Sequence, residues 1–588
     1  MSKGIRQIKI ILITCNALTT VIFAIGSILL WMTDYETLTN SVLKAVHKED
    51  WRPYFEQHVF PPNRFKTFQY LALLFSLAWT CFAYWFYKKS YYFAQIVSNF
   101  WQESRAIIRQ QIQQFERQEK IFFLVLLTGF ALRGISQIYR YELQYDEAWT
   151  YNHFISNGFL ISAISPNNNH LLYSLFACLF DYLPIGAKYS LRLPVYLGGL
   201  ATCILFYWMI RSIWKWQWAL VALAWFAFSP GICFYSMYAR GYIFQIFFTL
   251  LATWASLKIT TKWTTKPSAN YFWFVWVLAN ILGFYSVPTY AYIWMLLNAF
   301  LCIQMITKNT NWKPWIWANI FVLLTTSLLY FPLLISNGLN TLVAIASTEA
   351  PQGEAFLNYQ DKVADWILLG AGRLTSVYWF WCLLILSMLP IWWKTKSNVI
   401  RRVIELILLF LLFPSILNLS FGTQPPYRVW CFLTIFIALI IPLIGSFYTS
   451  KIKTSPFLVF LAIVLSSFSI WRTEVHYAIR WSAELDQEVK KIATTLLDIE
   501  FSEVYLFSNY DKPLLEYYYL QDQQRLKVLM AAPDSKNHAP FINAPIYQVV
   551  LWDKEDRVAS QEEQAWLEQY YPSILYEDDR VVLRKANQ

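Results

Sequence analysis

The chain is a succession of long apolar runs separated by short polar loops. The first run, Ile10 to Trp31, follows a basic N-terminus, and comparable runs recur as far as Phe457 to Trp471. About 20 apolar residues are enough for a helix to cross the hydrocarbon core of a bilayer. By this criterion the pattern predicts a mainly α, polytopic membrane protein with roughly 13 transmembrane helices.

Basic residues between the runs predict how the spans are oriented. Three of them precede the first run, and no small-residue cleavage site follows it, so we expect an uncleaved anchor with a cytoplasmic N-terminus. The loop at 258–270 contains three lysines and no acidic residue, which indicates a second cytoplasmic position. An odd number of spans then places the C-terminus outside the cytoplasm.

Two segments do not fit the simple pattern of spans. Residues 88–119 carry five basic residues among aromatic and amide side chains, which is typical of an amphipathic helix on the cytoplasmic leaflet or of a plain helical linker. The run Leu171 to Leu183 is apolar but short. If it crossed the membrane, Arg211 and Lys215 would lie outside, so we expect an interfacial helix instead.

These patterns divide the chain into three regions. Residues 1–119 form an N-terminal extension with two spans and the cytoplasmic segment, and residues 120–472 form the transmembrane core. Residues 473–588 are polar and periodic, and we expect a small extracytoplasmic α/β domain. Its predicted elements are a helix at Ala483–Leu497 and strands at Val504–Phe507, Leu526–Leu529, Tyr547–Leu551 and Val581–Leu583.

Composition supports this class and excludes others. Of the 588 residues only 14% are charged, whereas an ordinary soluble protein is about a quarter charged. The net charge of +11 is explained largely by loops between spans, so we expect no nucleic-acid partner. All eight cysteines lie in apolar runs, which argues against a disulfide framework or a cysteine metal site.

The candidate chemistry lies in the predicted outer loops. Asp146 and Glu147 follow the run Ile121 to Ile138, and His170 comes later in the same loop. Carboxylates are costly inside hydrocarbon, so this pair indicates a site at the membrane surface. Arginine binds phosphate through forked, charge-assisted hydrogen bonds, and a carboxylate can accept a proton from a hydroxyl. Four arginines are expected at span ends on the same side: Arg133, Arg192, Arg240 and Arg428.

Each of these residues also has a purely structural interpretation. Asp146 could cap the helix that follows it, and Glu147 would suit the positive end of that helix. The arginines could extend toward lipid headgroups. The sequence leaves these alternatives open.

Four motifs in order carry a resemblance that covers about residues 120–450. After Arg133 come Tyr145-Asp146-Glu147-Ala148, Asn169-His170-Leu171-Leu172-Tyr173, Leu191-Arg192-Leu193-Pro194 and Tyr238-Ala239-Arg240-Gly241-Tyr242. The pattern resembles the GT-C membrane glycosyltransferases, and is most similar to the branch with protein O-mannosyltransferases and the aminoarabinose transferase of lipid A. The resemblance implies a polyprenyl-phosphate-linked sugar donor, Asp146 as the catalytic centre, and interfacial helices after its loop.

The sequence departs from that family at two points. The family often has His-Pro-Pro where this chain has His170-Leu171-Leu172. A lysine found in some lipid A transferases has no match, which argues against lipid A as the acceptor.

The resulting hypothesis is an inverting glycosyltransferase (hexosyl- or pentosyltransferase) in a bacterial plasma membrane, with its active site on the extracytoplasmic face. Asp146 would be the general base, Glu147 and His170 would assist, and the arginines would hold the donor phosphate. The acceptor would be a glycan, lipid or protein hydroxyl, and membrane lipids would surround the spans. A divalent metal at Asp146, Glu147 and His170 stays open, and the expected substrate contacts are Tyr145, Tyr242 and Tyr427.

Two other classes of membrane protein fit the sequence less well than an enzyme does. A flippase or transporter of polyprenyl-linked glycans would need ionisable residues at mid-membrane depth, whereas the charged groups here lie near span ends. A non-catalytic scaffold with the same fold would be signalled by the loss of Asp146, which is present.

Overall fold

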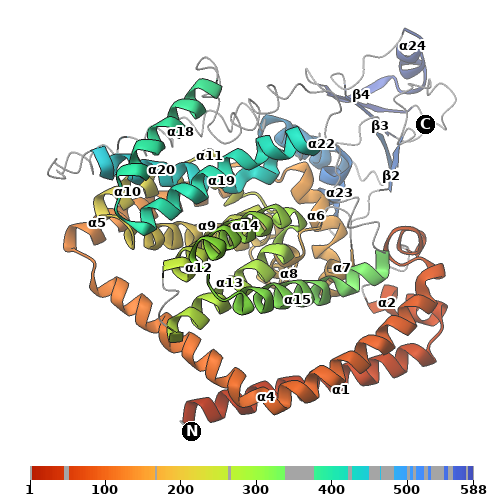
Figure 1. Ribbon diagram of the computed structural model, residues 1–588. Helices are drawn as coiled ribbons and strands as arrows, with labels where there is room; N and C mark the ends of the chain where they lie inside the picture. The colour runs from red at the N-terminus through yellow and green to blue at the C-terminus, as the bar shows by residue number, and fades with distance from the viewer. Residues whose placement is uncertain are drawn as a thin grey trace.

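The chain forms a bundle of helices with a long helical hairpin along one side and a small sheet at one end (Figure 1). The computed structural model describes residues 3–45, 52–165, 169–261, 266–337, 377–421, 427–448, 464, 483–498, 503–506, 511–521, 527–530, 549–553, 561–577 and 581–586. The predicted span Phe457–Trp471 and most of the outer loop at 335–365 lie outside these residues.

Eight helical stretches within the described residues are long and apolar enough to cross a membrane. The protein is therefore a polytopic integral membrane protein, as the sequence predicts. Further helices, α13 (Lys266–Ser286), α18 (Val377–Lys394) and α19 (Asn398–Phe421), coincide with three other predicted spans. The eight stretches contain α1 (Lys3–Met32), α4 (Phe65–Gln113), α5 (Arg117–Arg140), α9 (Ala187–Arg211), α12 (Tyr242–Thr261), α14 (Ala291–Lys308), α15 (Lys313–Asn337) and α20 (Leu433–Tyr448).

The N-terminal region is a hairpin of α1 and α4 that runs beside the bundle (Figure 1). The helix α4 has 49 residues and continues through most of the segment 88–119, so the second predicted span and that segment are one element. No glycine or proline occurs in α4, so nothing in its sequence interrupts the helix. Phe75 of α4 stacks on Phe331 of α15, with ring centroids 4.7 Å apart, and this contact joins the hairpin to the core. Short elements link the two helices: α2 (Tyr35–Ala45), α3 (Arg52–Tyr54), η2 (Phe55–Val59) and η3 (Pro62–Arg64).

One predicted span is interrupted. The sequence predicts a single helix at Trp218–Tyr235, but the structure has α10 (Trp216–Ala227) and α11 (Pro230–Tyr235). Pro230 has no N–H to donate to the preceding turn, and its ring favours the first turn of a new helix, so the chain restarts there. The break brings the loop after α11 close to the outer loop that carries Asp146.

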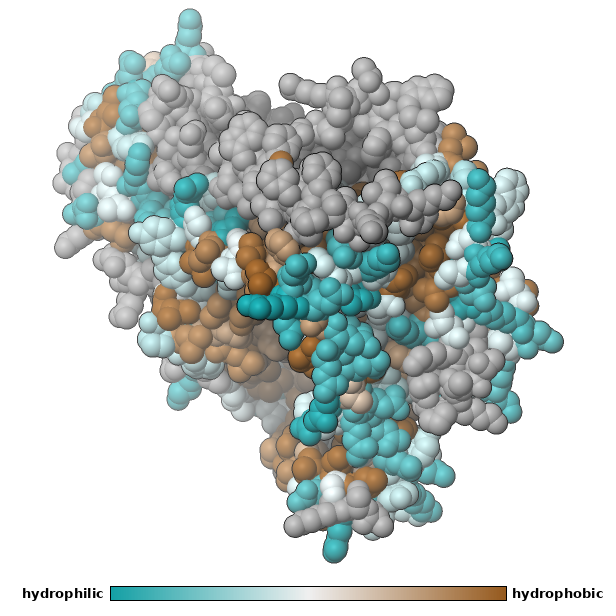
Figure 2. Space-filling view, turned by 90° about the vertical axis from the view of Figure 1, so that its left-hand side faces the viewer, coloured by the Kyte–Doolittle hydropathy of each residue, from teal (hydrophilic) through white to brown (hydrophobic). Residues whose placement is uncertain are grey.

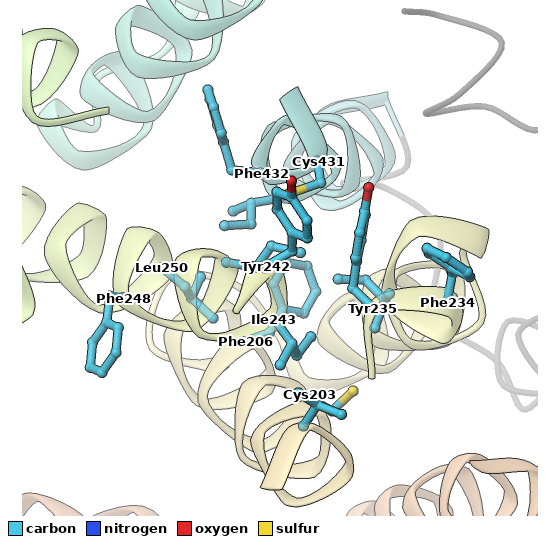
Figure 3. Packing of buried hydrophobic residues seen from close by; sticks show 14 of the residues in the cluster. Cys203, Phe206, Phe234, Tyr235, Tyr242, Ile243, Phe248, Leu250, Cys431 and Phe432 are labelled. Carbon is cyan, nitrogen blue, oxygen red and sulfur yellow. The ribbon is translucent and has the colours of Figure 1, made fainter. Parts of the chain in front are cut away.

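Aromatic and aliphatic side chains fill the centre of the bundle. Figure 3 shows Phe206 of α9, Ile243 of α12 and Phe432 packed in the same cluster. The rings of Phe206 and Phe226 stack with centroids 3.9 Å apart. Glycine allows the backbones to approach: a Cβ at Gly199 of α9 would lie 2.5 Å from that of Ser236.

The first loop of the core, which the sequence predicts to be an outer loop, contains short helices. They are α6 (Tyr145–His153), η4 (Ile155–Asn157), α7 (Gly158–Ile164) and α8 (Leu171–Asp181). At 11 residues α8 is too short to cross a bilayer, which agrees with its prediction as an interfacial element. Two short 3₁₀ helices, η5 (Pro288–Tyr290) and η7 (Tyr427–Phe432), precede α14 and α20.

The C-terminal region is an α/β domain beside α6 and α7 (Figure 1). The helix α22 (Ala483–Asp498) matches its prediction closely. The five-stranded sheet has the order β2-β1-β3-β5-β4, with β1 parallel to β2 and β3, and β5 antiparallel to β3 and β4. The strand β4 is an addition to the predicted set. The other elements are β1 (Glu503–Leu506), α23 (Asp511–Gln521), β2 (Lys527–Met530), β3 (Val549–Asp553), α24 (Gln561–Tyr570), β4 (Ser573–Glu577) and β5 (Val581–Lys585).

The end of the bundle opposite the sheet faces the viewer in Figure 2. Figure 2 shows hydrophilic residues gathered over the middle of that face, with hydrophobic residues beside them. Arg117 and Lys215 stand at the starts of α5 and α10, which lie toward this end in Figure 1. The positive-inside rule predicts that this end is cytoplasmic and that the end with α6 is extracytoplasmic.

Candidate active site

The first turn of α6 presents Asp146 away from the helix's own cap. The N-cap of α6 is Gln144, and its backbone N–H donates to Glu147 Oε2 at 2.9 Å. The capping interpretation of Asp146 is therefore wrong, because Gln144 and Glu147 share that task. The Asp146 carboxylate is left to face other elements.

Asp146 is bound by groups from two other parts of the chain. The Tyr238 hydroxyl donates to Asp146 Oδ2 at 2.8 Å, and Arg428 Nη1 lies 3.5 Å from the same oxygen. The Asp146 side chain is 18% exposed. Burial alone would raise its pKa, but the charge of Arg240, the Tyr238 hydrogen bond and the charge of Arg428 together hold the pKa below its ordinary value. Asp146 is therefore a carboxylate at neutral pH and can accept a hydrogen bond from a substrate hydroxyl.

Glu147 and Arg192 form a buried pair behind Asp146. Arg192 Nε and Nη2 donate to the two Glu147 oxygens at 2.9 and 2.6 Å, and both side chains are fully buried. Arg192 also donates to the carbonyls of Tyr141 and Glu142 at 2.7 Å each, and the Ala239 N–H donates to Glu147 at 2.8 Å. These contacts join α6, α9 and the loop after α11, so both side chains are engaged in holding these three elements together.

Arg240 stands beside Asp146 on the loop between α11 and α12. Its Nη1 donates to Thr150 Oγ1 at 2.8 Å, and Thr150 donates in turn to the Asp146 carbonyl at 2.7 Å. Arg240 is buried, whereas Arg428 at the start of η7 is 39% exposed. The two cations therefore differ in access: the Arg428 side chain is partly exposed, and Arg240 is enclosed by the protein.

His170 fixes the same loop from the other side. Its Nδ1 accepts the Gly241 N–H at 2.7 Å, and burial together with the charges of Arg240 and Arg428 holds its pKa well below the ordinary value. The neutral ring then carries its proton on Nε2. Position 241 requires glycine, because a Cβ there would lie 2.8 Å from both His170 Nδ1 and the Ser286 carbonyl.

The remaining predicted residues lie at different distances from this cluster. Tyr242 packs its ring edge-on against His170, with centroids 4.8 Å apart, and Figure 3 shows its hydroxyl pointing the same way as that of Tyr235. Tyr145 is half-buried and stacks on Trp149. Arg133 is buried within α5, about two turns before the helix ends. Tyr427 begins η7, and its side chain lies outside the described residues.

The three possible metal ligands are not gathered around one point. Both Glu147 oxygens and His170 Nδ1 already accept hydrogen bonds. In the part of the chain that the structure describes, no group of three or more His, Cys, Asp or Glu residues is arranged to hold a metal ion.

Sequence reasoning missed two residues of the site. Tyr238 lies within a motif that the sequence singled out, but its bond to Asp146 depends on the break before Pro230. Thr150 could have been found from helical spacing, because it lies four residues after Asp146 and so on the same face of α6.

The bundle and the short helices within its first core loop match the GT-C fold of membrane glycosyltransferases. The chain is similar to ArnT from Cupriavidus metallidurans in the apo state, with a TM-score of 0.53 and 11% identity over 78% of this chain and 97% of that one. For the same ArnT bound to undecaprenyl phosphate, the TM-score is 0.54 and the sequence identity is 10% over the same shares of the two chains. For the oligosaccharyltransferase of Archaeoglobus fulgidus in the apo form, the TM-score is 0.49 and the identity is 14%. The similarity covers 78% of this chain and 73% of that one. No protein-family model matches the sequence, and no curated protein matches it.

Proposed function

We propose that this protein is a glycosyltransferase that moves a sugar from a polyprenyl-phosphate-linked donor to an acceptor hydroxyl on the extracytoplasmic face of the membrane. The observation that carries the proposal is the Asp146 carboxylate with Arg428 3.5 Å away, at the end of a GT-C bundle. A base and a phosphate-binding cation thus face the same space. The fold is shared with a protein whose structure holds undecaprenyl phosphate.

In the proposed reaction the acceptor oxygen attacks the anomeric carbon of the donor sugar. Its proton passes to Asp146 as the new glycosidic bond forms. The bond between the anomeric carbon and the phosphate oxygen breaks, and polyprenyl phosphate leaves with the electron pair. Attack opposite the leaving group inverts the anomeric configuration.

Donor binding would make Asp146 a stronger base. In the free protein the charges of Arg240 and Arg428 keep its pKa low. A donor phosphate beside Arg428 brings negative charge next to Asp146 and competes for the same guanidinium. Both effects raise the Asp146 pKa, because nearby negative charge disfavours a second carboxylate charge. The base would therefore gain strength only when the donor is in place.

The two arginines would share the phosphate unequally. Arg428 is partly exposed, and its Nη1 lies 3.5 Å from Asp146, which is longer than an ordinary hydrogen bond, so it can turn to a ligand. Arg240 is committed to Thr150 and would contribute mainly through its charge. Glu147, His170 and Arg192 would hold these groups in place.

The alternative of a flippase is disfavoured by where the charges lie. Asp146, Arg240 and Arg428 all stand in loops or at the first turns of helices, at one end of the bundle. Carrying a phosphate-linked glycan across would require ionisable groups near the middle of the membrane.

The test is the transfer rate of Asp146→Asn in purified protein reconstituted with lipid-linked sugars from the cells that make it. Loss of a general base lowers the rate by about 10²- to 10⁴-fold. Asp181→Asn is the matched control, because Asp181 is another partly buried carboxylate of the same loop and accepts a hydrogen bond from the Ser190 hydroxyl at 3.1 Å. Parental transfer by folded Asp146→Asn would remove Asp146 from the mechanism.

A further inference from the structure

A cavity lies beside α6 but outside the Asp146 cluster. It has a volume of about 760 Å³ and is lined by the end of α5, the start of α9, Glu142, and residues of α22 and α23. The transmembrane core and the C-terminal domain therefore both contribute to its walls. We call it the seam pocket and define it by Tyr139, Arg140, Glu142, Lys188, Lys490 and Tyr518.

The seam pocket carries an excess of positive charge. Lys490 Nζ lies 2.9 Å and Lys188 Nζ 3.3 Å from the same Glu142 oxygen. Two ammonium groups thus share one carboxylate, and Arg140 adds a further cation. Three positive groups and one negative group leave a surplus of two charges. A pocket with this surplus attracts an anion, all the more where protein walls reduce screening by water.

The same pocket offers aromatic surface. Tyr139 at the end of α5 is 75% exposed, and Tyr189 and Tyr518 also line the cavity. Tyrosine combines a flat apolar face with a hydroxyl, which suits a ligand that has both C–H faces and hydroxyl groups. Cations and tyrosines together fit a sugar ring that carries a negative group.

The position of the pocket relates it to the proposed reaction. Glu142 lies four residues before Asp146, so their Cα atoms can be at most about 14 Å apart along an extended chain. The Arg192 guanidinium bonds the Glu142 carbonyl and the Glu147 carboxylate, and so connects the pocket wall to the first turn of α6. An acceptor whose anionic sugar occupies the pocket would extend over this distance to bring its hydroxyl to the base.

We propose that the seam pocket is the acceptor site and that it recognises a sugar bearing a phosphate or carboxylate group. Lys188 and Lys490 bind the anionic group, and Tyr139 packs against the ring. The C-terminal domain supplies Lys490 and Tyr518, so it completes the acceptor site. This inference rests on the proposed glycosyltransferase function.

The first experiment measures binding to the full-length protein in nanodiscs of phosphatidylcholine. The probes are glucose 6-phosphate, glucose and inorganic phosphate. Saturation-transfer NMR and calorimetry measure the binding of each. Glucose 6-phosphate should bind more tightly than either of the others and should lose affinity as salt is added. Equal binding of glucose and glucose 6-phosphate, or no binding of the latter, would overturn the proposal.

Two neighbouring lysines of α22 provide a matched pair of variants. Lys490 lines the pocket, whereas Lys491 is exposed outside it. Lys490→Met should weaken glucose 6-phosphate binding on the order of tenfold, as expected for a lost charge-assisted hydrogen bond. Lys491→Met removes the same charge from the same helix and should change binding by about twofold or less. Equal effects of the two substitutions would show that the net charge alone matters and would refute the site.

Tyrosine variants test the sugar-binding wall separately. Tyr139→Ala should weaken glucose 6-phosphate binding but leave phosphate binding unchanged. Tyr182→Ala is its control, because Tyr182 is equally exposed at the end of α8 and does not line the pocket. If Tyr139→Ala changes the binding of neither probe, the sugar ring does not contact this wall, and the sugar assignment fails.

Two further experiments make distinctions that the variants above do not. The first distinguishes a soluble ligand from a lipid headgroup, and the second distinguishes failure of the acceptor site from failure of the proposed function. Nanodiscs containing phosphatidylglycerol should leave glucose 6-phosphate binding unchanged. If they abolish it, the pocket is a headgroup site and the acceptor assignment is wrong. Asp146→Asn should keep glucose 6-phosphate binding while losing transfer. Transfer that persists in Asp146→Asn defeats the proposed function, whereas intact binding in Lys490→Met defeats only the acceptor site.

Discussion

Glu147 and Arg192 meet through two parallel hydrogen bonds of 2.9 and 2.6 Å, and neither side chain reaches solvent. The two residues are 45 positions apart in the chain, one on α6 and one on the transmembrane helix α9. Their pairing sets the angle at which α6 leaves the bundle. Since Asp146 is the neighbour of Glu147, the pair also sets where the proposed base points.

Glu147→Gln should therefore act mainly on stability. The substitution keeps the shape of the side chain but leaves the Arg192 charge buried without its carboxylate, and breaking a buried pair in this way costs about 3–5 kcal/mol. The free energy of unfolding in mixed micelles checks this, with Asp181→Asn as a control. Unchanged stability together with lost transfer would mean that Glu147 takes part in the chemistry itself.

Tyr238→Phe should shift the pH dependence of transfer. The Tyr238 hydroxyl stabilises the charged form of Asp146, so its removal raises the Asp146 pKa. The acid limb of the kcat/KM profile, where the base becomes protonated, should then move to higher pH. Tyr196→Phe is the control, because the Tyr196 hydroxyl bonds the Ala131 carbonyl within the spans. An acid limb that stays in place would show that another group titrates there.

The two arginines beside Asp146 should separate into a binding and a supporting residue. Arg428→Ala should weaken donor binding by about 1.5–3 kcal/mol, the cost of a charge-assisted contact. Its side chain is partly exposed, so stability should change little. Arg240→Ala should lower stability as well, because it removes a buried partner of Thr150. Donor titration and unfolding of both variants make the comparison, and identical behaviour would contradict it.

Much of the fold could be predicted because hydrophobic runs report span positions directly. The runs at Ile10–Trp31 and Ile121–Ile138 coincide with α1 and α5, and the short run at 171–183 coincides with α8. The break at Pro230 could have been inferred from that residue. In α4 the sequence indicates a boundary that the structure does not have. The change in polarity at Lys88 marks a change in the surroundings of the helix, but the helix itself continues.

The candidate site could be predicted only in part, because its contacts join distant segments. The sequence singles out Asp146, Arg240 and Arg428, which the structure brings together. It does not reveal that Arg192 is committed to Glu147 and to two carbonyls. Adjacent carboxylates look alike in a sequence, and only the packing of α9 against α6 separates the buried Glu147 from the accessible Asp146.

The orientation of the protein is tested by cysteine labelling in a background from which the eight native cysteines are removed. A cysteine at Tyr182 should react with an impermeant reagent in intact cells, because that residue is exposed at the end that carries α6. A cysteine at Lys313 should react only after the cells are opened, because it lies at the predicted cytoplasmic start of α15. Labelling of position 313 in intact cells would reverse the assignment.

The C-terminal domain should hold α6 in place through Asn152. The Asn152 side chain donates to the Pro513 carbonyl of α23 at 2.8 Å, and the rings of Tyr151 and Tyr517 meet edge-on beside it. Asn152→Ala leaves that carbonyl without its buried donor, which costs about 1–3 kcal/mol, while the tyrosine contact remains. The contact between α6 and α23 should loosen, but the two helices should stay together. Amide hydrogen exchange should therefore become faster in α6 and α23 but not in the distant spans. Asn319→Ala removes a side-chain hydrogen bond within α15 alone, so it should leave the exchange rates of α6 and α23 unchanged. Equal protection of α6 in Asn152→Ala and the parent protein would show that the transmembrane core holds this helix without the C-terminal domain.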